Sequence, residues 1–222
     1  MKKVQDMEHN WKIKYPRRNV YLMRNHNWAF SAWEIGRINK EIKPGAKLLH
    51  VDFHDDYSEP SQRLNEIETK EEAIRIAETL TITEFIKAAE KTGTIKEVFS
   101  IGDYEKPSDE ICHSYTYNQF EYEYRKEFFR TEGQSFILDL DLDFFNLHAH
   151  RFIDNNHDNN PYRFSDEFIR KQLEFLKNYE DEWSLVSVCI SPEHCGGSEN
   201  AQQILEIFLD TFDLNNEDYI YW

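Results

Sequence analysis

Two histidines and three aspartates occupy the seven-residue segment HVDFHDD, residues 50–56. The segment continues an apolar run, so we expect it at the end of a buried strand. Alternate residues of an extended strand share one face, which places Asp52, His54 and Asp56 together. Charged groups are costly to remove from water unless a partner compensates them. The segment is therefore either a solvated acidic loop or part of a cation-binding site.

A second series of carboxylates lies in FILDLDLDFF, residues 136–145, where Asp139, Asp141 and Asp143 recur at every second position. Strands disfavour aspartate, and three like charges on one buried face would repel each other or take up protons. A divalent cation removes this conflict, whereas a solvated edge strand would avoid it. Carboxylate and imidazole ligands without thiolates suit manganese, iron or zinc better than calcium.

Polar side chains also follow three other apolar runs. His26 follows residues 19–23, Asp103 follows residues 95–102, and Glu193 and His194 follow residues 184–191. Because the carboxyl ends of parallel strands share one edge of a sheet, we expect these groups to converge there. Each also has an ordinary explanation, such as a capping or core histidine for His26 and a helix-start acid for Glu193.

Apolar runs alternate with helical patterns along the whole chain. The predicted strands cover residues 19–23, 46–53, 95–102, 134–142 and 184–191. The predicted helices cover residues 27–42, 69–92 (as one or two helices), 165–182 and 198–212. The strands are continuous apolar runs, which is typical of a parallel sheet covered on both faces. We therefore predict a single α/β domain over residues 1–222, a three-layer α/β/α sandwich with a mainly parallel sheet. Residues 114–130 fit neither pattern, and residues 148–164 are predicted to form a long loop.

The composition narrows the class of protein. The 222 residues include 42 acidic and 26 basic side chains, so the net charge is −16, which disfavours binding to nucleic acid and favours cationic ligands. Three cysteines, Cys112, Cys189 and Cys195, are too few for a disulfide framework and fit a reducing compartment. No apolar leader or spanning segment is evident, so a cytoplasmic protein without a membrane partner is expected.

Counting the ligands distinguishes one ion from two. The counted side chains are His26, Asp52, His54, Asp56, Asp139 and Asp141. Their four carboxylates balance two divalent ions, and six ligands exceed what one tetrahedral ion takes. Two ions roughly 3.5–4 Å apart can activate a single water.

The same residues resemble known motifs. The segment DFHDD, residues 52–56, resembles the D-x-H-x-D pattern of the arginase/agmatinase (ureohydrolase) family, and FILDLD is similar to that family's apolar strand ending in D-x-D. The segments HVDFHDD, LDLDLDFF and SPEHCGG resemble the motifs of a small ureohydrolase-like family that includes peptide arginases. The resemblance covers the strand ends from about residue 20 to residue 197. It implies an arginase-like fold, two divalent ions, most readily Mn²⁺, and hydrolysis of free or peptide-borne arginine to ornithine and urea.

The resemblance also implies roles for individual residues. His26 stands where the family has the histidine of a G-G-D-H element, which here reads MRNHNW, and Glu193 stands where arginases hold the substrate guanidinium. The implied metal ligands are His26, Asp52, His54, Asp56, Asp139, Asp141 and Asp143, and the extra aspartate leaves open which two of the last three bind. Glu193 and His194 are the implied catalytic residues, with Glu193 and Asp103 as substrate contacts. The candidates for the proton-shuttling histidine are His113, His148, His150, His157 and His194.

Three other functions use the same residues. A deacetylase-like amide hydrolase would bind a single zinc through two aspartates and a histidine. A dinuclear phosphoesterase would need a basic phosphate clamp, which the motifs lack. A non-catalytic metal- or partner-binding protein would keep the ligands without turnover. The sequence predicts a cationic small-molecule or peptide substrate and leaves the oligomeric state open.

Overall fold

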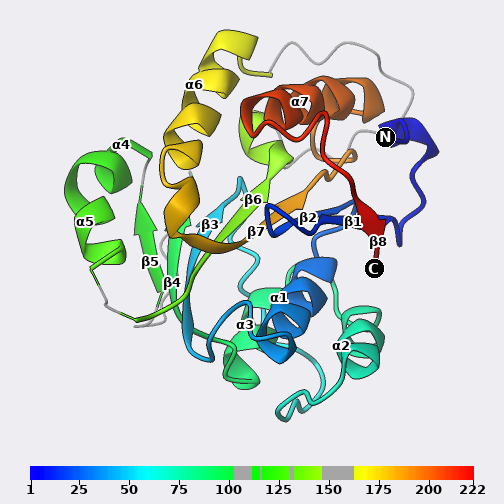
Figure 1. Cartoon of the computed structure of the whole chain (residues 1–222), viewed down its shortest axis with the longest axis vertical. Helices are drawn as coiled ribbons and strands as arrows, with labels where there is room; N and C mark the ends of the chain where they lie inside the picture. The colour runs from blue at the N-terminus through cyan, green and yellow to red at the C-terminus, as the bar shows by residue number, and fades with distance from the viewer. Residues whose placement is uncertain (103–111, 116, 131–132, 147–162) are drawn as a thin grey trace.

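The computed structural model describes residues 1–102, 112–115, 117–130, 133–146 and 163–222, and in these residues eight strands form one sheet (Figure 1). The strands are β1 (Lys12–Tyr15), β2 (Val20–Met23), β3 (Ala46–Val51), β4 (Ile95–Ile101), β5 (Cys112–Tyr115), β6 (Phe136–Asp141), β7 (Trp183–Cys189) and β8 (Ile220–Tyr221). Their order is β5-β4-β3-β6-β7-β2-β1-β8. All pairs from β5 to β2 are parallel, and β1 is antiparallel to both β2 and β8. The predicted mainly parallel sheet is confirmed.

Helices cover both faces of this sheet. The helical segments are η1 (Val4–Asp6), α1 (Trp28–Ile38), α2 (Lys70–Ala77), α3 (Phe85–Lys91), α4 (Tyr117–Gln119), the π-helix η2 (Phe120–Tyr124), α5 (Arg125–Phe128), η3 (Leu142–Phe145), α6 (Asp166–Lys177), η4 (Glu180–Glu182) and α7 (Ser198–Thr211). Helices α1, α2 and α3 lie on one face and α6 and α7 on the other (Figure 1). In β3, Leu48 packs into the core on the side of α1–α3, and Leu49 packs into the core on the side of α6 and α7, so the strand is buried on both sides. This is the expected three-layer sandwich.

Some boundaries differ from the prediction. Helices α1 and α6 end four or five residues before their predicted ends. The segment 69–92, predicted as one or two helices, forms two, α2 and α3. Residues 114–130 contain the end of β5 followed by α4, η2 and α5, where described. Most of the predicted loop 148–164 lies outside the described residues. None of the helices in the described segments is both long and apolar enough to cross a membrane.

The direction of chain progression reverses between β3 and β6. From β3 the chain continues outward to β4, whereas β6 pairs with the opposite side of β3 and leads on to β7. In this parallel pair, His50 lies opposite Asp139 and Val51 opposite Leu140. The carboxyl ends of β3 and β6 are therefore adjacent at a topological switch point, which is where α/β sheets form ligand sites.

A buried ion pair fixes α1 to its neighbours. Glu34 is fully buried, and its carboxylate accepts hydrogen bonds from the hydroxyls of Thr92 and Thr94 and from the guanidinium of Arg37. Arg37 also donates to the carbonyl of Ile67 in the loop before α2. Because every oxygen of the carboxylate has a donor, this network holds α1 against the α3–β4 connection.

Replacing Glu34 by alanine should therefore lower the free energy of unfolding by about 3–5 kcal/mol, because the Arg37 charge would be left buried without its main partner. The matched control is Glu66→Ala, since Glu66 contacts the same guanidinium at 3.5 Å but has a side chain that is 76% exposed. The control should change stability by less than about 1 kcal/mol. Urea denaturation measures both, and equal effects would contradict this account of α1.

Candidate metal centre

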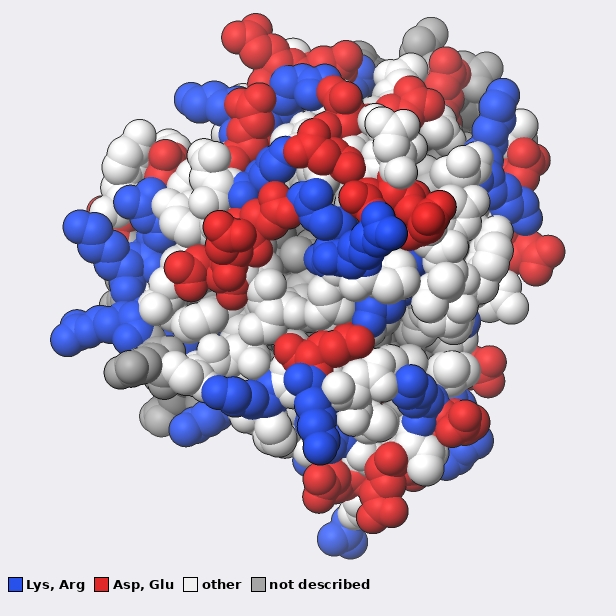
Figure 2. Space-filling view, viewed as in Figure 1, with Lys and Arg blue, Asp and Glu red and all other residues white. Residues whose placement is uncertain are grey.

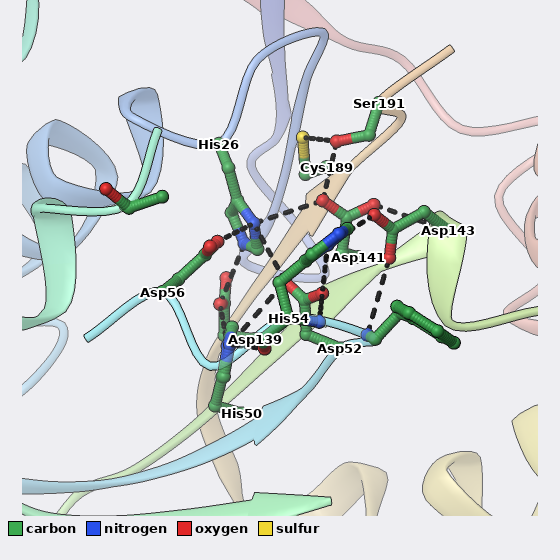
Figure 3. A network of polar contacts seen from close by, with 12 residues as sticks. His26, His50, Asp52, His54, Asp56, Asp139, Asp141, Asp143, Cys189 and Ser191 are labelled. Atoms are coloured by element: carbon green, nitrogen blue, oxygen red, sulfur yellow. Dashed lines mark hydrogen bonds and ion pairs between the residues drawn. The ribbon is translucent and has the colours of Figure 1, made fainter. Parts of the chain in front are cut away.

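Five aspartates and three histidines meet at the switch point (Figure 3). They come from the residue positions after β2, from β3 and the loop that follows it, and from β6 and η3. These residues are His26, His50, Asp52, His54, Asp56, Asp139, Asp141 and Asp143. All are buried except His54, whose side chain is 33% exposed. The seven predicted ligands are thus brought together, and the structure adds His50.

His26 lies at the centre of the cluster. Its Nδ1 atom is 3.2 Å from Oδ2 of Asp52 and 3.1 Å from Oδ2 of both Asp56 and Asp141. One ring nitrogen cannot donate to three carboxylates, and neither this Nδ1 nor Oδ2 of Asp52 has a hydrogen-bond partner in the described residues. Leaving buried polar atoms unsatisfied is costly. A cation between these groups would satisfy both atoms at once.

Asp139, in contrast, is fully satisfied by donors from the protein. Its Oδ1 accepts from the hydroxyl of Ser187 at 2.6 Å, and its Oδ2 lies 2.9 Å from Nε2 of His26 and 2.8 Å from Nδ1 of His50. Ser187 is itself fixed by the indole N–H of Trp33 at 2.9 Å. With Nε2 of His26 donating to Asp139, the lone pair of Nδ1 faces the other carboxylates. A carboxylate that orients a histidine in this way is the usual outer partner of a metal ligand.

His50 was not among the predicted site residues. Its Nδ1 faces Asp139, and its Nε2 lies 3.3 Å from the carbonyl oxygen of His54, so both ring nitrogens have an acceptor. Burial opposes protonation of His50, but the hydrogen bond to Asp139 and the charge of Asp52 outweigh it and raise the pKa. The same two-residue period that marked Asp52 and His54 also includes position 50 and could have revealed it.

The acidic groups that remain are in electrostatic conflict. Burial and then the charge of Asp52 raise the pKa of Asp56 to about 6. Burial and then the charge of Asp141 raise the pKa of Asp143 well above its ordinary value. Burial also opposes ionisation of Asp52 and Asp139, but contacts with His26 outweigh it and lower the pKa of Asp52, and that of Asp139 to about 2. Positive charge on the histidines thus offsets part of the repulsion.

The histidine pKa values change in the opposite direction. Burial disfavours the charged form of His26, but the charge of Asp139 outweighs it and raises the pKa well above the usual range. For His54 the hydrogen bonds to Asp143 and Asp52 outweigh burial and raise the pKa to about 11. Because a bound metal requires a neutral imidazole, a divalent ion would take over the role that these protons have here.

The ligand atoms form adjacent groups that share one residue. His26, Asp52 and Asp56 each offer an atom within 4.8 Å of the others, and so do Asp52, Asp141 and Asp143. His54 extends the second group, with Nδ1 3.0 Å from Oδ2 of Asp143. Asp52 therefore lies between two candidate positions for an ion.

A cavity of about 220 Å³ opens onto this cluster. Its lining residues are His26, His54, Asp55, Asp56, Ile82, Thr83, Asp141, Asp143, Ser191 and His194. Asp139 is not among them, which places Asp141 and Asp143 on the open side of the centre. The hydroxyl of Ser191 donates to Oδ2 of Asp141 at 2.5 Å and lies 3.0 Å from the thiol of Cys189.

The loop that carries Asp56 is fixed to the start of α3. Asp56 has a positive φ of 44°, and two residues later the Ser58 amide donates to the carbonyl of Thr83 at 2.8 Å. The ring of Phe85 lies against that of His26, with centroids 4.4 Å apart. The cavity wall formed by Ile82 and Thr83 and the ligands of the first group are thus held by one segment.

The other predicted site residues have different placements. His194 lines the cavity, and its ring centroid lies 5.1 Å from that of His54. Glu193 instead forms an ion pair with the buried guanidinium of Arg24 and does not line the cavity. Asp103, His148, His150 and His157 lie outside the described residues, as does the side chain of His113.

Comparison with known proteins gives the fold. No family model and no curated protein matches the sequence. The structure is similar to proclavaminate amidino hydrolase from Streptomyces clavuligerus, with a TM-score of 0.52 and 16% identity over 87% of this chain and 64% of that chain. It is also similar to arginase from Bacillus cereus, with a TM-score of 0.51 and 14% identity over 89% and 71% of the two chains. A third similar structure is formimidoylglutamase from Bacillus subtilis, with a TM-score of 0.53 and 11% identity over 88% of this chain and 61% of that chain. The chain therefore has an arginase-like fold, as expected, but it spans less than two thirds of the length of two of these proteins.

Asp52→Asn should reduce the manganese content more than Asp56→Asn, because Asp52 belongs to both ligand groups and Asp56 to only one. Loss of Asp56 should leave one of two ions in place, whereas loss of Asp52 should weaken both. Elemental analysis after equilibrium dialysis against Mn²⁺ measures the content. Equal loss of manganese in the two variants would contradict the shared role of Asp52.

Asp139→Asn should lower the affinity for Mn²⁺ by about 10–100-fold without changing the secondary structure, because the amide no longer holds His26 as a carboxylate does. Competition with a fluorescent chelator gives the affinity, and circular dichroism reports the fold. Asp181→Asn, at an exposed position before β7, is the control. An unchanged affinity would show that Asp139 does not orient a ligand.

Proposed function

We propose that this protein is a dinuclear metal-dependent hydrolase that cleaves the guanidino C–N bond of free or peptide-borne arginine and releases urea. The observation that carries the proposal is the pair of ligand groups that share Asp52 at the switch point of an arginase-like sheet. The names of two structural neighbours, an amidino hydrolase and an arginase, favour a guanidino substrate.

The residues present fit two divalent ions. His26, Asp52 and Asp56 would hold one ion, and Asp52, Asp141 and Asp143 with His54 would hold the other. The unsatisfied Nδ1 of His26 and Oδ2 of Asp52 are the atoms that such ions would use, and oxygen with imidazole ligands suits Mn²⁺. Ions of this kind, when bound, supply a water whose pKa is lowered toward neutrality. Of the three aspartates in the strand motif, Asp139 then serves as the partner of His26 and His50.

The chain's own residues would prepare the reaction around the ions. The turn after β7 places His194 at the cavity, and the side-chain amide of Asn146 holds its carbonyl oxygen at 2.5 Å. His194 is thus positioned to give a proton to the leaving amine. Ser191 keeps Asp141 oriented by its hydrogen bond. Glu193 has Arg24 as its partner, so in this arrangement it fixes the turn, and the cavity aspartates provide the negative charge for a cationic substrate.

The charges on the face shown in Figure 2 do not favour a different site for a cationic ligand. On the face shown in Figure 2, acidic and basic side chains are interspersed, and no single-sign patch dominates the view. Attraction of a cationic substrate would therefore depend on the carboxylates of the cavity, most of which are buried, so their charge acts more strongly than on the open surface. This arrangement favours a small cationic group over a large charged partner.

The decisive experiment combines metal analysis with a urea-release assay on arginine, agmatine and arginine-containing peptides in the presence of Mn²⁺. We expect two ions per chain and urea from at least one of these compounds, and Asp52→Asn should reduce the rate by about 100-fold or more because it disturbs both ions. A single zinc with hydrolysis of acetyl-lysine would instead support the deacetylase-like alternative. Full metal content with no turnover of any compound would indicate a metal-binding protein without this activity.

A further inference from the structure

One charged residue at the cavity has no place in either ligand group. Asp55 lies between His54 and Asp56, is exposed, and lines the cavity beside Ile82 and Thr83. It contributes to none of the possible metal-binding groups among the described residues, and it makes no ion pair or hydrogen bond with them. Its carboxylate is therefore available at the rim of the cavity.

The charge of Asp55 would persist when the centre is loaded. Two divalent ions neutralise the carboxylates of the ligand groups, including Asp56, Asp141 and Asp143, because those oxygens become ligands. Asp55 lies outside this set, and no lysine or arginine of the described part of the chain lines the cavity. The loaded cavity would thus keep one net negative charge on its open side.

The other predicted anchor for a cation is already occupied. Glu193 pairs with the guanidinium of Arg24, whose side chain is 9% exposed, and Arg24 also contacts His9 and Asn25 at 3.0 Å. Exchanging this buried partner for a ligand would cost the free energy of a desolvated ion pair. Asp55 therefore has no competitor from Glu193 at the rim.

We infer that Asp55 determines substrate specificity by sensing the charge at the end of the substrate that lies farthest from the guanidino group. The inference rests on the proposed function, since it assumes that the guanidino group faces the ions. The side chain of Ile82 is 44% exposed and offers an apolar wall for the methylene chain between the two ends. A cationic end is favoured, a neutral amide is accepted, and a carboxylate without a nearby ammonium group is disfavoured.

Three compounds with the same guanidino chain test this charge preference. Arginine amide has a positive remote end, N-acetylarginine amide a neutral end, and N-acetylarginine a negative end. Binding to the Mn²⁺-loaded full chain is measured by calorimetry, and kcat/KM by urea release. We expect the amide to bind at least about fivefold more tightly than N-acetylarginine, since two nearby charges at a solvated site contribute roughly 1 kcal/mol.

Variants at position 55 should change the ratio of the two affinities. Asp55→Asn should reduce the preference for the cationic end, and Asp55→Lys should reverse it in favour of N-acetylarginine. The matched control is Asp181→Lys, which makes the same change of charge at an exposed position before β7, at the opposite edge of the sheet. The ratio within one variant is compared, so a small change in metal content affects both compounds equally. Raising the salt concentration to about 0.5 M should reduce the preference in the wild type.

Each result decides between the two proposals. An unchanged ratio in Asp55→Lys, a wild-type preference for N-acetylarginine, or no binding of any of the three compounds would overturn the role of Asp55. Urea release without a charge preference would overturn that role alone and leave the proposed function intact. Charge-dependent binding without urea release would overturn the proposed function and leave the role of Asp55 in binding intact.

Discussion

Repulsion among buried carboxylates is the constraint around which this fold is arranged. Asp52 offers a carboxylate oxygen within 4.8 Å of those of Asp56, Asp141 and Asp143, and the parallel pairing of β3 and β6 brings the chain segments that carry them together. A sheet interior built from continuous apolar strands cannot solvate these charges, so partners must come from the neighbouring strands or from bound cations. The sheet supplies rigid positions, and the histidines supply part of the compensating charge.

The number of protein donors that offset the charge of each carboxylate decreases from the inside of the molecule toward the cavity. At the inner end, Asp139 is surrounded by Ser187, His26 and His50, and both of its oxygens face donors. One pleat farther along β6, Asp141 has the Ser191 hydroxyl and the amide of Asp143 on its oxygens and still lies 3.1 Å from His26. At the cavity, Asp143 has mainly His54 to offset its charge. The need for an external cation thus increases toward the open side, where an ion can enter.

Much of this arrangement could be predicted from the sequence because it depends on local periods. The apolar runs predicted the five central strands. The two-residue spacing identified Asp52, His54 and Asp56 as site residues, but β3 ends at Val51 and Asp56 has a φ of 44°, so a loop rather than the expected extended strand brings them to the site. Strand β1 and the two edge strands, β5 and β8, were not predicted. Lys12–Tyr15 alternates charged and apolar residues, and Ile220–Tyr221 has only two residues. Lys14 is buried there only because Glu41 and the ring of Tyr21 receive its ammonium group.

The pairing of side chains from neighbouring strands could not be predicted from the sequence. Glu193 follows a strand and carries the expected charge, but its pairing with Arg24 depends on β2 lying beside β7. The two residues are 169 positions apart, and no local pattern indicates that distance. The same holds for Ser187, which orients Asp139 from the adjacent strand. Local spacing therefore predicts which side chains reach the sheet edge, whereas tertiary packing decides which of them remain available to a ligand.

The left-handed backbone at Asp56 restricts what this position can become. A φ of 44° is tolerated by glycine, asparagine and aspartate and is costly for most other residues. Of these three, only aspartate carries a charge. The substitutions that preserve the shape of the turn are therefore asparagine and glycine. Both are uncharged, so each removes a carboxylate ligand. A homologue with asparagine or glycine at this position would keep the fold and would lack one carboxylate ligand of the metal centre.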